Sequence, residues 1–185
     1  MGGVSRAGNG RGRVDVDCGD GGEWGCAMKE WGREKRLRTR SENGTLALGQ
    51  LLTELLPAPK LVVLRGDLGM GKTTLVRGMA AALGADSTDV TSPTFTLVHE
   101  YRGRKARLIH LDLYRLEEER EIEGIGLWEM AEAQDALVMV EWGDRFASVM
   151  ERADAEIAIG QGEAENERLL MVRWRDLKGN AKGRE

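Results

Sequence analysis

The chain has 185 residues, a formal net charge of −4 and 41% hydrophobic residues, which is typical of one globular domain with a sizeable core. Its longest apolar runs, such as residues 136–140, are far shorter than the roughly 18 residues that a membrane-spanning helix needs. The start of the chain has no apolar stretch of the kind found in secretory signals, so we expect a cytoplasmic protein. Cys18 and Cys26 match neither a common zinc spacing nor a Cys-x-x-Cys motif, and we interpret them as free thiols.

Residues 1–40 differ in composition from the rest of the chain. They hold ten of the 25 glycines and carry a net charge of +3, whereas the remaining residues carry −7. Because they have few aliphatic side chains, they cannot bury enough apolar area to offset the entropy lost on ordering, and we predict a disordered extension. Its basic end, residues 33–40, is either a solvated tail or a contact to RNA. Met28 is an alternative start, and the role of residues 1–40 stays open.

Hydrophobic periodicity and turn residues predict one α/β domain over residues 41–176, followed by a flexible tail over residues 177–185. A helix at residues 45–56 is capped by Ser41 or Thr45 and ended by Pro57 and Pro59. The other expected elements are a buried strand at 61–64, a helix at 73–83 closed by Gly84, strands at 94–101 and 107–113, a charged helix at 117–132, a buried strand at 136–142, and a hairpin of 155–159 and 169–174. Alternating strands and helices followed by strand pairs predict a mixed, partly parallel sheet.

Residues 66–74, GDLGMGKTT, form a complete P-loop pattern between a predicted strand and a predicted helix. Glycines let backbone N–H groups turn toward phosphates, and the helix N-terminus adds partial positive charge. Lys72 is expected to bind the β- and γ-phosphates, and the Thr73 hydroxyl is expected to coordinate Mg²⁺. The predicted nucleotide-binding residues here are Gly66, Asp67, Leu68, Gly69, Met70, Gly71, Lys72, Thr73 and Thr74. We therefore expect a P-loop NTPase-like, three-layer fold.

Two predicted strands end in acidic residues that complete such a site. LIHLD ends at Asp112 and LVMVE ends at Glu141, and ligands of open α/β sheets bind beyond the carboxyl ends of parallel strands. We assign Asp112 to Mg²⁺, usually through water, and Glu141 to the attacking water or the metal, and the division of labour between the two stays open. The expected catalytic residues are Glu141, Asp112 and Lys72, and the expected metal ligands are Thr73, Asp112 and Glu141.

The residues around these motifs suggest further contacts with the nucleotide. Thr91, Ser92, Pro93 and Thr94 stand where P-loop switch proteins hold a loop that senses the γ-phosphate, and they form either such a switch-like loop or a capped turn. Trp142 follows Glu141 and is expected near the nucleotide, at a partner or in the core. The sequence has no Asn-Lys-x-Asp tetrad for guanine, which favours ATP over GTP.

The segments GDLGMGKTTLVRG, TSPTFTLVHEY, HLDLYRL and VEWGDR, in this order and spacing, resemble the TsaE family over residues 42–174. TsaE proteins are small bacterial ATPases that serve the synthesis of threonylcarbamoyladenosine in tRNA. The resemblance implies ATP and Mg²⁺ as cofactors, the TsaD and TsaB proteins as partners, and tRNA contacted indirectly through that complex, with no role for membranes or DNA. It also implies that Glu141 and Trp142 are the family's Glu-Trp pair for hydrolysis and that the segment with Glu42 and Thr45 closes over the adenine. Met70 departs from the small residue usual at its position, and its side chain is expected to point away from the phosphates.

Two other functions stay open. One is a small-molecule kinase in which Arg102, Arg104, Lys105 and Arg107 act as a mobile lid, although these residues fit a hairpin turn better. The other is a binding module that uses ATP only to hold its shape. Because no Arg-rich insertion follows the P-loop helix, we expect weak hydrolysis by the isolated chain that rises in the TsaD–TsaB complex. The acidic folded part opposes broad phosphate binding, while direct tRNA contact and oligomeric state stay open.

Overall fold

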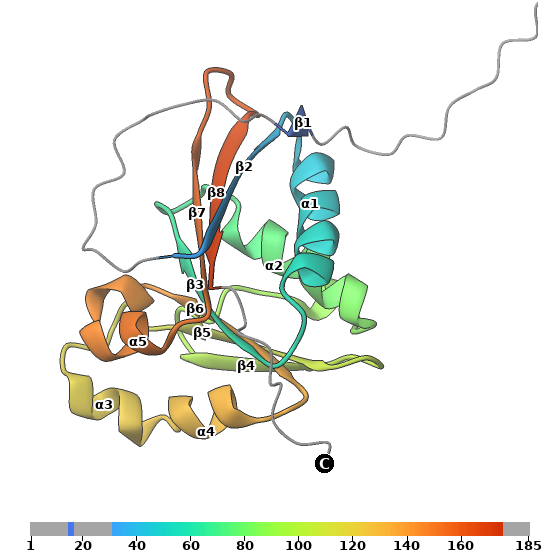
Figure 1. Ribbon diagram of the computed structural model, residues 1–185. Coiled ribbons are helices and arrows are strands. Elements are labelled where there is room, and N and C mark those ends of the chain that lie inside the picture. Colours follow the sequence, from blue (N-terminus) through green and yellow to red (C-terminus); the bar gives the residue numbers. More distant parts are fainter. Residues whose placement is uncertain (1–14, 17–30, 176–185) are drawn as a thin grey trace, which may run out of the picture.

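The computed structural model describes residues 15–16 and 31–175 (Figure 1). Most of the predicted N-terminal extension, including Cys18, Cys26 and Met28, and all of the predicted C-terminal tail lie outside these residues. Within the described residues, one mixed sheet of eight strands lies between two layers of helices. The predicted three-layer α/β fold with a mixed, partly parallel sheet is therefore confirmed.

The centre of the sheet is a block of four parallel strands. Their side chains are buried on both faces, as the continuous apolar runs in the sequence predict. The carboxyl ends of these strands meet at one edge of the sheet, where Leu64 and Asp112 are both in register with Glu141. In spatial order the strands are β7 (Ala155–Gln161), β3 (Lys60–Arg65), β6 (Ala136–Glu141) and β5 (Arg107–Asp112).

Antiparallel strands flank this block on both sides. β4 (Val98–Arg102) pairs with β5 at one edge. At the other edge, β8 (Arg168–Trp174) forms the predicted hairpin with β7 and pairs in turn with β2 (Arg33–Thr39), which carries the short β1 (Asp15–Val16). The block that positions the site is thus extended by three strands on the β7 side and by one strand on the β5 side.

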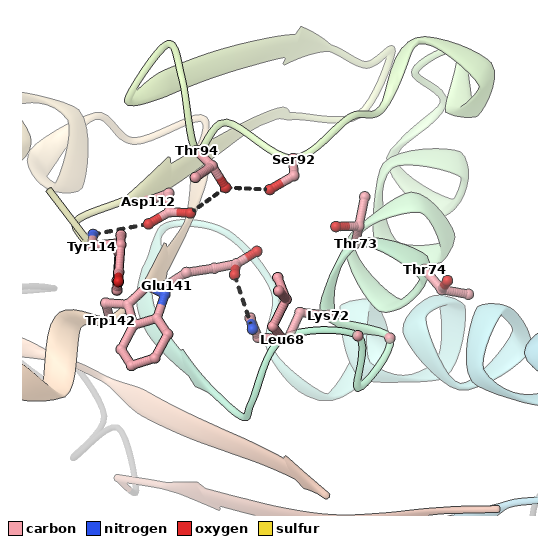
Figure 2. A pocket seen from close by; sticks show the side chains of 12 residues that line it. Leu68, Lys72, Thr73, Thr74, Ser92, Thr94, Asp112, Tyr114, Glu141 and Trp142 are labelled. Carbon is pink, nitrogen blue, oxygen red and sulfur yellow. Dashed lines mark hydrogen bonds and ion pairs between the residues drawn. The ribbon is translucent and has the colours of Figure 1, made fainter. Parts of the chain in front are cut away.

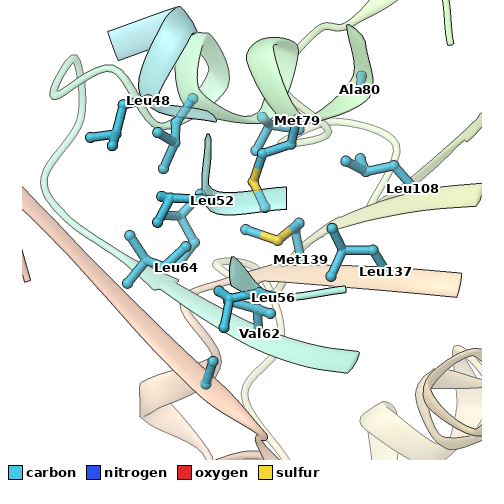
Figure 3. Close-up of a cluster of buried hydrophobic side chains, with 14 of the residues drawn as sticks. Leu48, Leu52, Leu56, Val62, Leu64, Met79, Ala80, Leu108, Leu137 and Met139 are labelled. Atoms are coloured by element: carbon cyan, nitrogen blue, oxygen red, sulfur yellow. The ribbon is translucent and has the colours of Figure 1, made fainter. Parts of the chain in front are cut away.

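Alternate side chains of the central strands pack against two different helix layers. Val62 and Leu64 of β3 belong to the core beneath α1 and α2, whereas Leu61 and Val63 belong to the core beneath the other helices (Figures 1 and 3). No helix of the described residues has the length and apolar character needed to cross a membrane. The helices are α1 (Glu42–Leu55), α2 (Lys72–Leu83), α3 (Glu119–Gly124), α4 (Leu127–Glu132) and α5 (Ala147–Arg152), with short 3-10 turns at Ser87–Asp89 and Gly143–Arg145.

Helices α1 and α2 approach each other closely where two glycines meet. Ser41 caps α1 by accepting a hydrogen bond from the Gly44 backbone N–H, as one of the two predicted caps. Further along, a Cβ added at Gly49 would overlap the Leu75 carbonyl oxygen, and it would lie 3.1 Å from the Cα of Gly78. A Cβ added at Gly78 would in turn lie 3.2 Å from the Cα of Gly49. The two glycines therefore set the position of α2, the helix that begins at the P-loop lysine.

The prediction of disorder is wrong for residues 33–39, which form β2. The segment has one aliphatic side chain, Leu37, and this residue is 2% exposed in the core beneath α1. Glu34, Arg36 and Arg38 lie on the other face, where the Glu34 carboxylate accepts hydrogen bonds from Arg36 and Arg173. Pairing with β8 along the whole strand supplies the stabilisation that the composition does not reveal.

Two other predicted elements differ in extent. The helix expected at residues 117–132 is two short helices, α3 and α4, because Gly126 adopts a left-handed conformation with φ 73° between them. The strand expected at residues 94–101 begins only at Val98, because residues 94–97 form a turn in which the Pro93 carbonyl accepts hydrogen bonds from the N–H groups of Thr96 and Leu97.

Candidate nucleotide-binding site

The segment between β3 and α2 has the backbone geometry of a phosphate-binding loop. Gly66 and Gly71 have φ values of 148° and 96°, which L side chains rarely adopt, and a Cβ at Gly66 would also collide with Ile159 of β7. The Lys72 ammonium donates to the carbonyl oxygens of Gly66 and Asp67 at 2.7 and 3.1 Å. The lysine is thus held across the loop at the N-terminus of α2, where partial positive charge favours an anion.

A pocket of about 630 Å³ opens in front of this loop (Figure 2). Residues from four separated segments of the sequence meet in it, at the carboxyl edge of the parallel strands. It is lined by Leu68, Gly69, Gly71, Lys72, Thr73, Thr74, Ser92, Thr94, Asp112, Tyr114, Glu141 and Trp142. The predicted catalytic residues and the predicted metal ligands therefore all face one cavity.

Asp112 lies at the end of β5 and its carboxylate is fixed from two sides. The Thr94 hydroxyl donates to Oδ2 at 2.8 Å, and the Tyr114 backbone N–H donates to Oδ1 at 2.9 Å. The Asp112 backbone N–H also donates to the carbonyl of Leu97 at 3.0 Å. These contacts tie the loop at residues 91–97 to the acid that we assigned to Mg²⁺.

Glu141, at the end of β6, is buried and bound through both carboxylate oxygens. Oε2 lies 3.3 Å from the Lys72 ammonium, and Oε1 lies 2.9 Å from Nε2 of His110. His110 is not among the site residues predicted from the sequence. A signal was available, because His110 precedes Asp112 by two residues on the same strand and so lies on the same face.

Trp142 adopts a left-handed backbone conformation with φ 60°, which is uncommon for a residue with a side chain. Its ring packs against Tyr114, with centroids 5.3 Å apart, and lies 5.8 Å from the Lys72 ammonium. Trp142 also lines a second pocket of about 300 Å³, together with Gly66, Asp67 and Met70. The indole therefore forms a wall between the two cavities, at a point where the chain turns sharply out of the sheet.

The residues of the predicted switch-like loop, 91–94, contact two different parts of the molecule. Ser92 and Thr94 line the main pocket, and their hydroxyls lie 2.8 Å apart. Thr91 instead faces β4, where its carbonyl and its N–H both contact the Tyr101 hydroxyl. Pro93 is buried between them. The arrangement anchors one end of the loop to the sheet and presents the other end to the pocket.

The remaining predicted site residues do not line the main pocket. Thr45 is buried in α1, where its hydroxyl lies 2.8 Å from that of Thr39, and Glu42 is exposed in the first turn of the same helix. Met70 packs against the core beneath α1 and α2, and its carbonyl accepts a hydrogen bond from Nε of Arg168 in β8. This last contact joins the P-loop to the sheet extension on the β7 side.

The residues in the pocket fit a magnesium nucleotide. The donor set for a cation is the Thr73 hydroxyl with the carboxylates of Asp112 and Glu141, and Mg²⁺ prefers oxygen ligands of this kind. The Lys72 ammonium and the backbone N–H groups at the start of α2 suit the phosphates. The two carboxylates come from neighbouring parallel strands in register, so that both can approach one ion.

The basic turn considered as a kinase lid lies at the opposite end of the sheet. Arg107 begins β5, whereas Asp112 ends it, which separates the two by roughly 16 Å along the strand. Arg107 is paired with Asp135, and Arg102 with Glu100. These contacts fit the interpretation of residues 102–105 as a hairpin turn.

Comparisons with known proteins agree with the motifs. A family model described as "Threonylcarbamoyl adenosine biosynthesis protein TsaE" matches residues 39–170. Proteins named "tRNA threonylcarbamoyladenosine biosynthesis protein TsaE" are 45% identical in Nostoc sp., over 57% of this chain and 65% of that protein, and 40% identical in Aquifex aeolicus, over 60% of this chain and 78% of that protein. The chain thus spans just under two thirds of the Nostoc relative. The crystal structure of Bacillus subtilus YdiB superposes with a TM-score of 0.56 at 29% identity, covering 77% of this chain and 86% of that one.

Proposed function

This chain belongs to the TsaE family of tRNA threonylcarbamoyladenosine biosynthesis proteins, and we propose that it serves this modification by binding and hydrolysing ATP. The observation that carries the proposal is the convergence of Lys72, Thr73, Asp112 and Glu141 on one pocket at the carboxyl edge of the sheet. A lysine, a hydroxyl and two carboxylates are the groups that P-loop ATPases use to hold a triphosphate, its Mg²⁺ and the attacking water.

The residues of the pocket have separate tasks in this proposal. Lys72 and the N–H groups at the start of α2 bind the β- and γ-phosphates. Thr73 and Asp112 hold Mg²⁺, which when bound neutralises charge that develops on the phosphate oxygens. Glu141 orients the attacking water, because its Oε2 faces the pocket beside Lys72. Thr94 holds the Asp112 carboxylate in place and so connects the switch-like loop to the metal.

We further propose that TsaD and TsaB cover the mouth of this pocket and that tRNA is reached through them in the cytoplasm. Two large side chains that line the pocket are exposed, namely Leu68 (91%) and Tyr114 (57%), and Phe95 (83%), the residue after the pocket residue Thr94, is exposed as well. Such side chains are enriched at protein interfaces and lose contact with water when a partner binds. A partner seated here would also sequester the nucleotide and could supply positive charge to it.

ATP hydrolysis by the purified full chain, with and without its cognate TsaD and TsaB, tests this function. We expect hydrolysis to need Mg²⁺, to rise when both partners are present, and to fall strongly in Glu141→Gln, which keeps the size of the side chain but loses its charge. Equal hydrolysis with and without the partners would remove the assignment to this pathway. If Glu141→Gln hydrolysed ATP at the wild-type rate, Glu141 would have no catalytic role. That result would favour a module that uses ATP only to hold its shape.

A further inference from the structure

His110 is a polar side chain in a position that an aliphatic residue would be expected to fill. It lies in the middle of β5, with an exposed fraction of 0%, and the neighbouring strand places Met139 opposite it. Burying an imidazole without a hydrogen bond is unfavourable, whereas leucine or methionine would fill the same space without that cost. The contact that the structure gives its polar atoms is the one between Nε2 and Oε1 of Glu141, at 2.9 Å.

The surroundings indicate where the imidazole carries its proton. A carboxylate only accepts hydrogen bonds, so Nε2 must be the protonated nitrogen in a contact with Glu141. Nδ1 is buried and has no hydrogen-bond partner among the described residues. An unpaired lone pair there is easier to tolerate than an unpaired N–H group. The environment therefore favours the tautomer in which Nε2–H donates to Glu141.

The two oxygens of Glu141 then have different environments. Oε2 faces Lys72 at the pocket, whereas Oε1 faces His110 in the interior of the sheet. A bound triphosphate would draw the Lys72 ammonium toward its own oxygens and so weaken the contact with Oε2. The bond from His110 would be unaffected, because it lies behind the carboxylate and away from the nucleotide.

We propose that His110 is the positioning residue of Glu141: its Nε2–H holds Oε1 so that Oε2 stays directed at the nucleotide after Lys72 has moved to the phosphates. The inference rests on the proposed ATPase function. It deepens that function by assigning the orientation of the catalytic carboxylate to a histidine that does not itself line the pocket. A carboxylate free to rotate would lose the alignment that catalysis requires.

Two substitutions of similar length separate positioning from core filling. His110→Gln places an amide N–H group near the position of Nε2, whereas His110→Met fills similar space without a donor. In the full chain with TsaD and TsaB, we expect His110→Met to lower kcat about 10- to 100-fold while KM and ATP affinity change less than about twofold, as is typical when a supporting hydrogen bond to a catalytic ligand is lost. We expect His110→Gln to recover most of kcat, and His110→Met to add little to Glu141→Gln, because the two residues act as a unit.

Several results would overturn the inference. They are an unchanged kcat in His110→Met, an equal loss of kcat in the Gln and Met variants when both are as thermally stable as the wild type, and full additivity with Glu141→Gln. A ¹⁵N NMR spectrum of the chain, which has two histidines, gives a readout besides activity. It should show the His110 proton on Nε2, and a proton on Nδ1 would also overturn the inference. A wild type that fails to hydrolyse ATP with both partners present would instead refute the proposed function, and the inference with it.

Discussion

Replacing Gly49 with alanine should destabilise the protein although alanine is the better helix former. Gly49 lies in α1 at the crossing with α2, and a Cβ there would overlap the Leu75 carbonyl oxygen and lie 3.0 Å from the Met79 nitrogen. Both of these atoms belong to the backbone of α2, so that no side-chain rotation can make room. The helices would have to move apart, and the apolar side chains between them would lose contact.

The expected magnitude follows from two opposing effects. Overpacking of this kind costs about 1–3 kcal/mol, and we place Gly49→Ala near the upper value because the obstacle is backbone. Alanine stabilises a helix by roughly 0.5–1 kcal/mol relative to glycine. The net loss is then about 2 kcal/mol, which corresponds to a decrease in Tm of about 4–8 °C for a chain of this size.

Thermal and urea unfolding followed by circular dichroism would measure this loss. The matched control is Gly124→Ala at the end of α3, where no atom lies within 4 Å of the added Cβ. The control should be as stable as the wild type or more stable by up to about 1 kcal/mol. A Gly49→Ala variant as stable as the control would refute the claim that the two helices are in backbone contact.

Three further predictions concern the site and the edge of the sheet. Lys72→Met removes the ammonium expected on the phosphates, and calorimetry should show ATP binding weakened about 10- to 100-fold. Thr94→Val removes the hydroxyl that donates to Asp112, and it should raise the Mg²⁺ concentration for half-maximal hydrolysis about 10-fold. The hydrogen bond from the backbone N–H of Glu163 holds the pKa of Glu167 in the folded protein below its ordinary value. The ionised carboxylate therefore stabilises the fold fully when the pH is above the ordinary pKa, and this stabilisation is lost as the pH falls through the lower pKa of the folded state. Denaturation at several pH values should therefore show Glu167→Gln less stable than the wild type at pH 7, with the difference narrowing in acid.

Two of these predictions have a control variant. Thr94→Ser keeps the hydroxyl and should need Mg²⁺ at the wild-type concentration, so an equal effect of valine and serine would contradict the role of the hydrogen bond. Arg102→Met removes a cation far from the pocket and should leave ATP affinity unchanged, unlike Lys72→Met. A constant difference in stability between Glu167→Gln and the wild type at all pH values would contradict the lowered pKa.

The parts of the site that sequence predicts are those encoded in contiguous residues. The spacing of its glycines and lysine identifies the P-loop, and their positions at the ends of apolar strands identify Asp112 and Glu141. The rule that parallel strands bring their carboxyl ends together then places both acids in one pocket, as the structure has them. A local pattern and a topological rule are enough to predict this part of the site, because neither requires knowledge of which distant segments pair with each other.

The parts that sequence does not predict depend on pairing between distant segments. β2 is stable because it pairs with β8, whose paired residues lie 129 to 141 positions further along the chain. Arg168, which is 98 residues downstream of Met70, donates a hydrogen bond to the P-loop. The role of His110 can be inferred only from its contact with Glu141, on another strand. Charge and periodicity within 33–40 indicate a tail, since Leu37, the strand's single aliphatic side chain, produces no alternating pattern.

The strand β2 has a practical consequence for anyone who trims this protein for expression. The family match begins at residue 39, the last residue of the strand, so a boundary drawn there would remove almost all of it. β8 would become an edge strand, with a row of backbone N–H and C=O groups open to pairing with another chain. Such an edge favours aggregation, and the core would lose Leu37 as well. A fragment that is to stay in solution should therefore begin before Arg33.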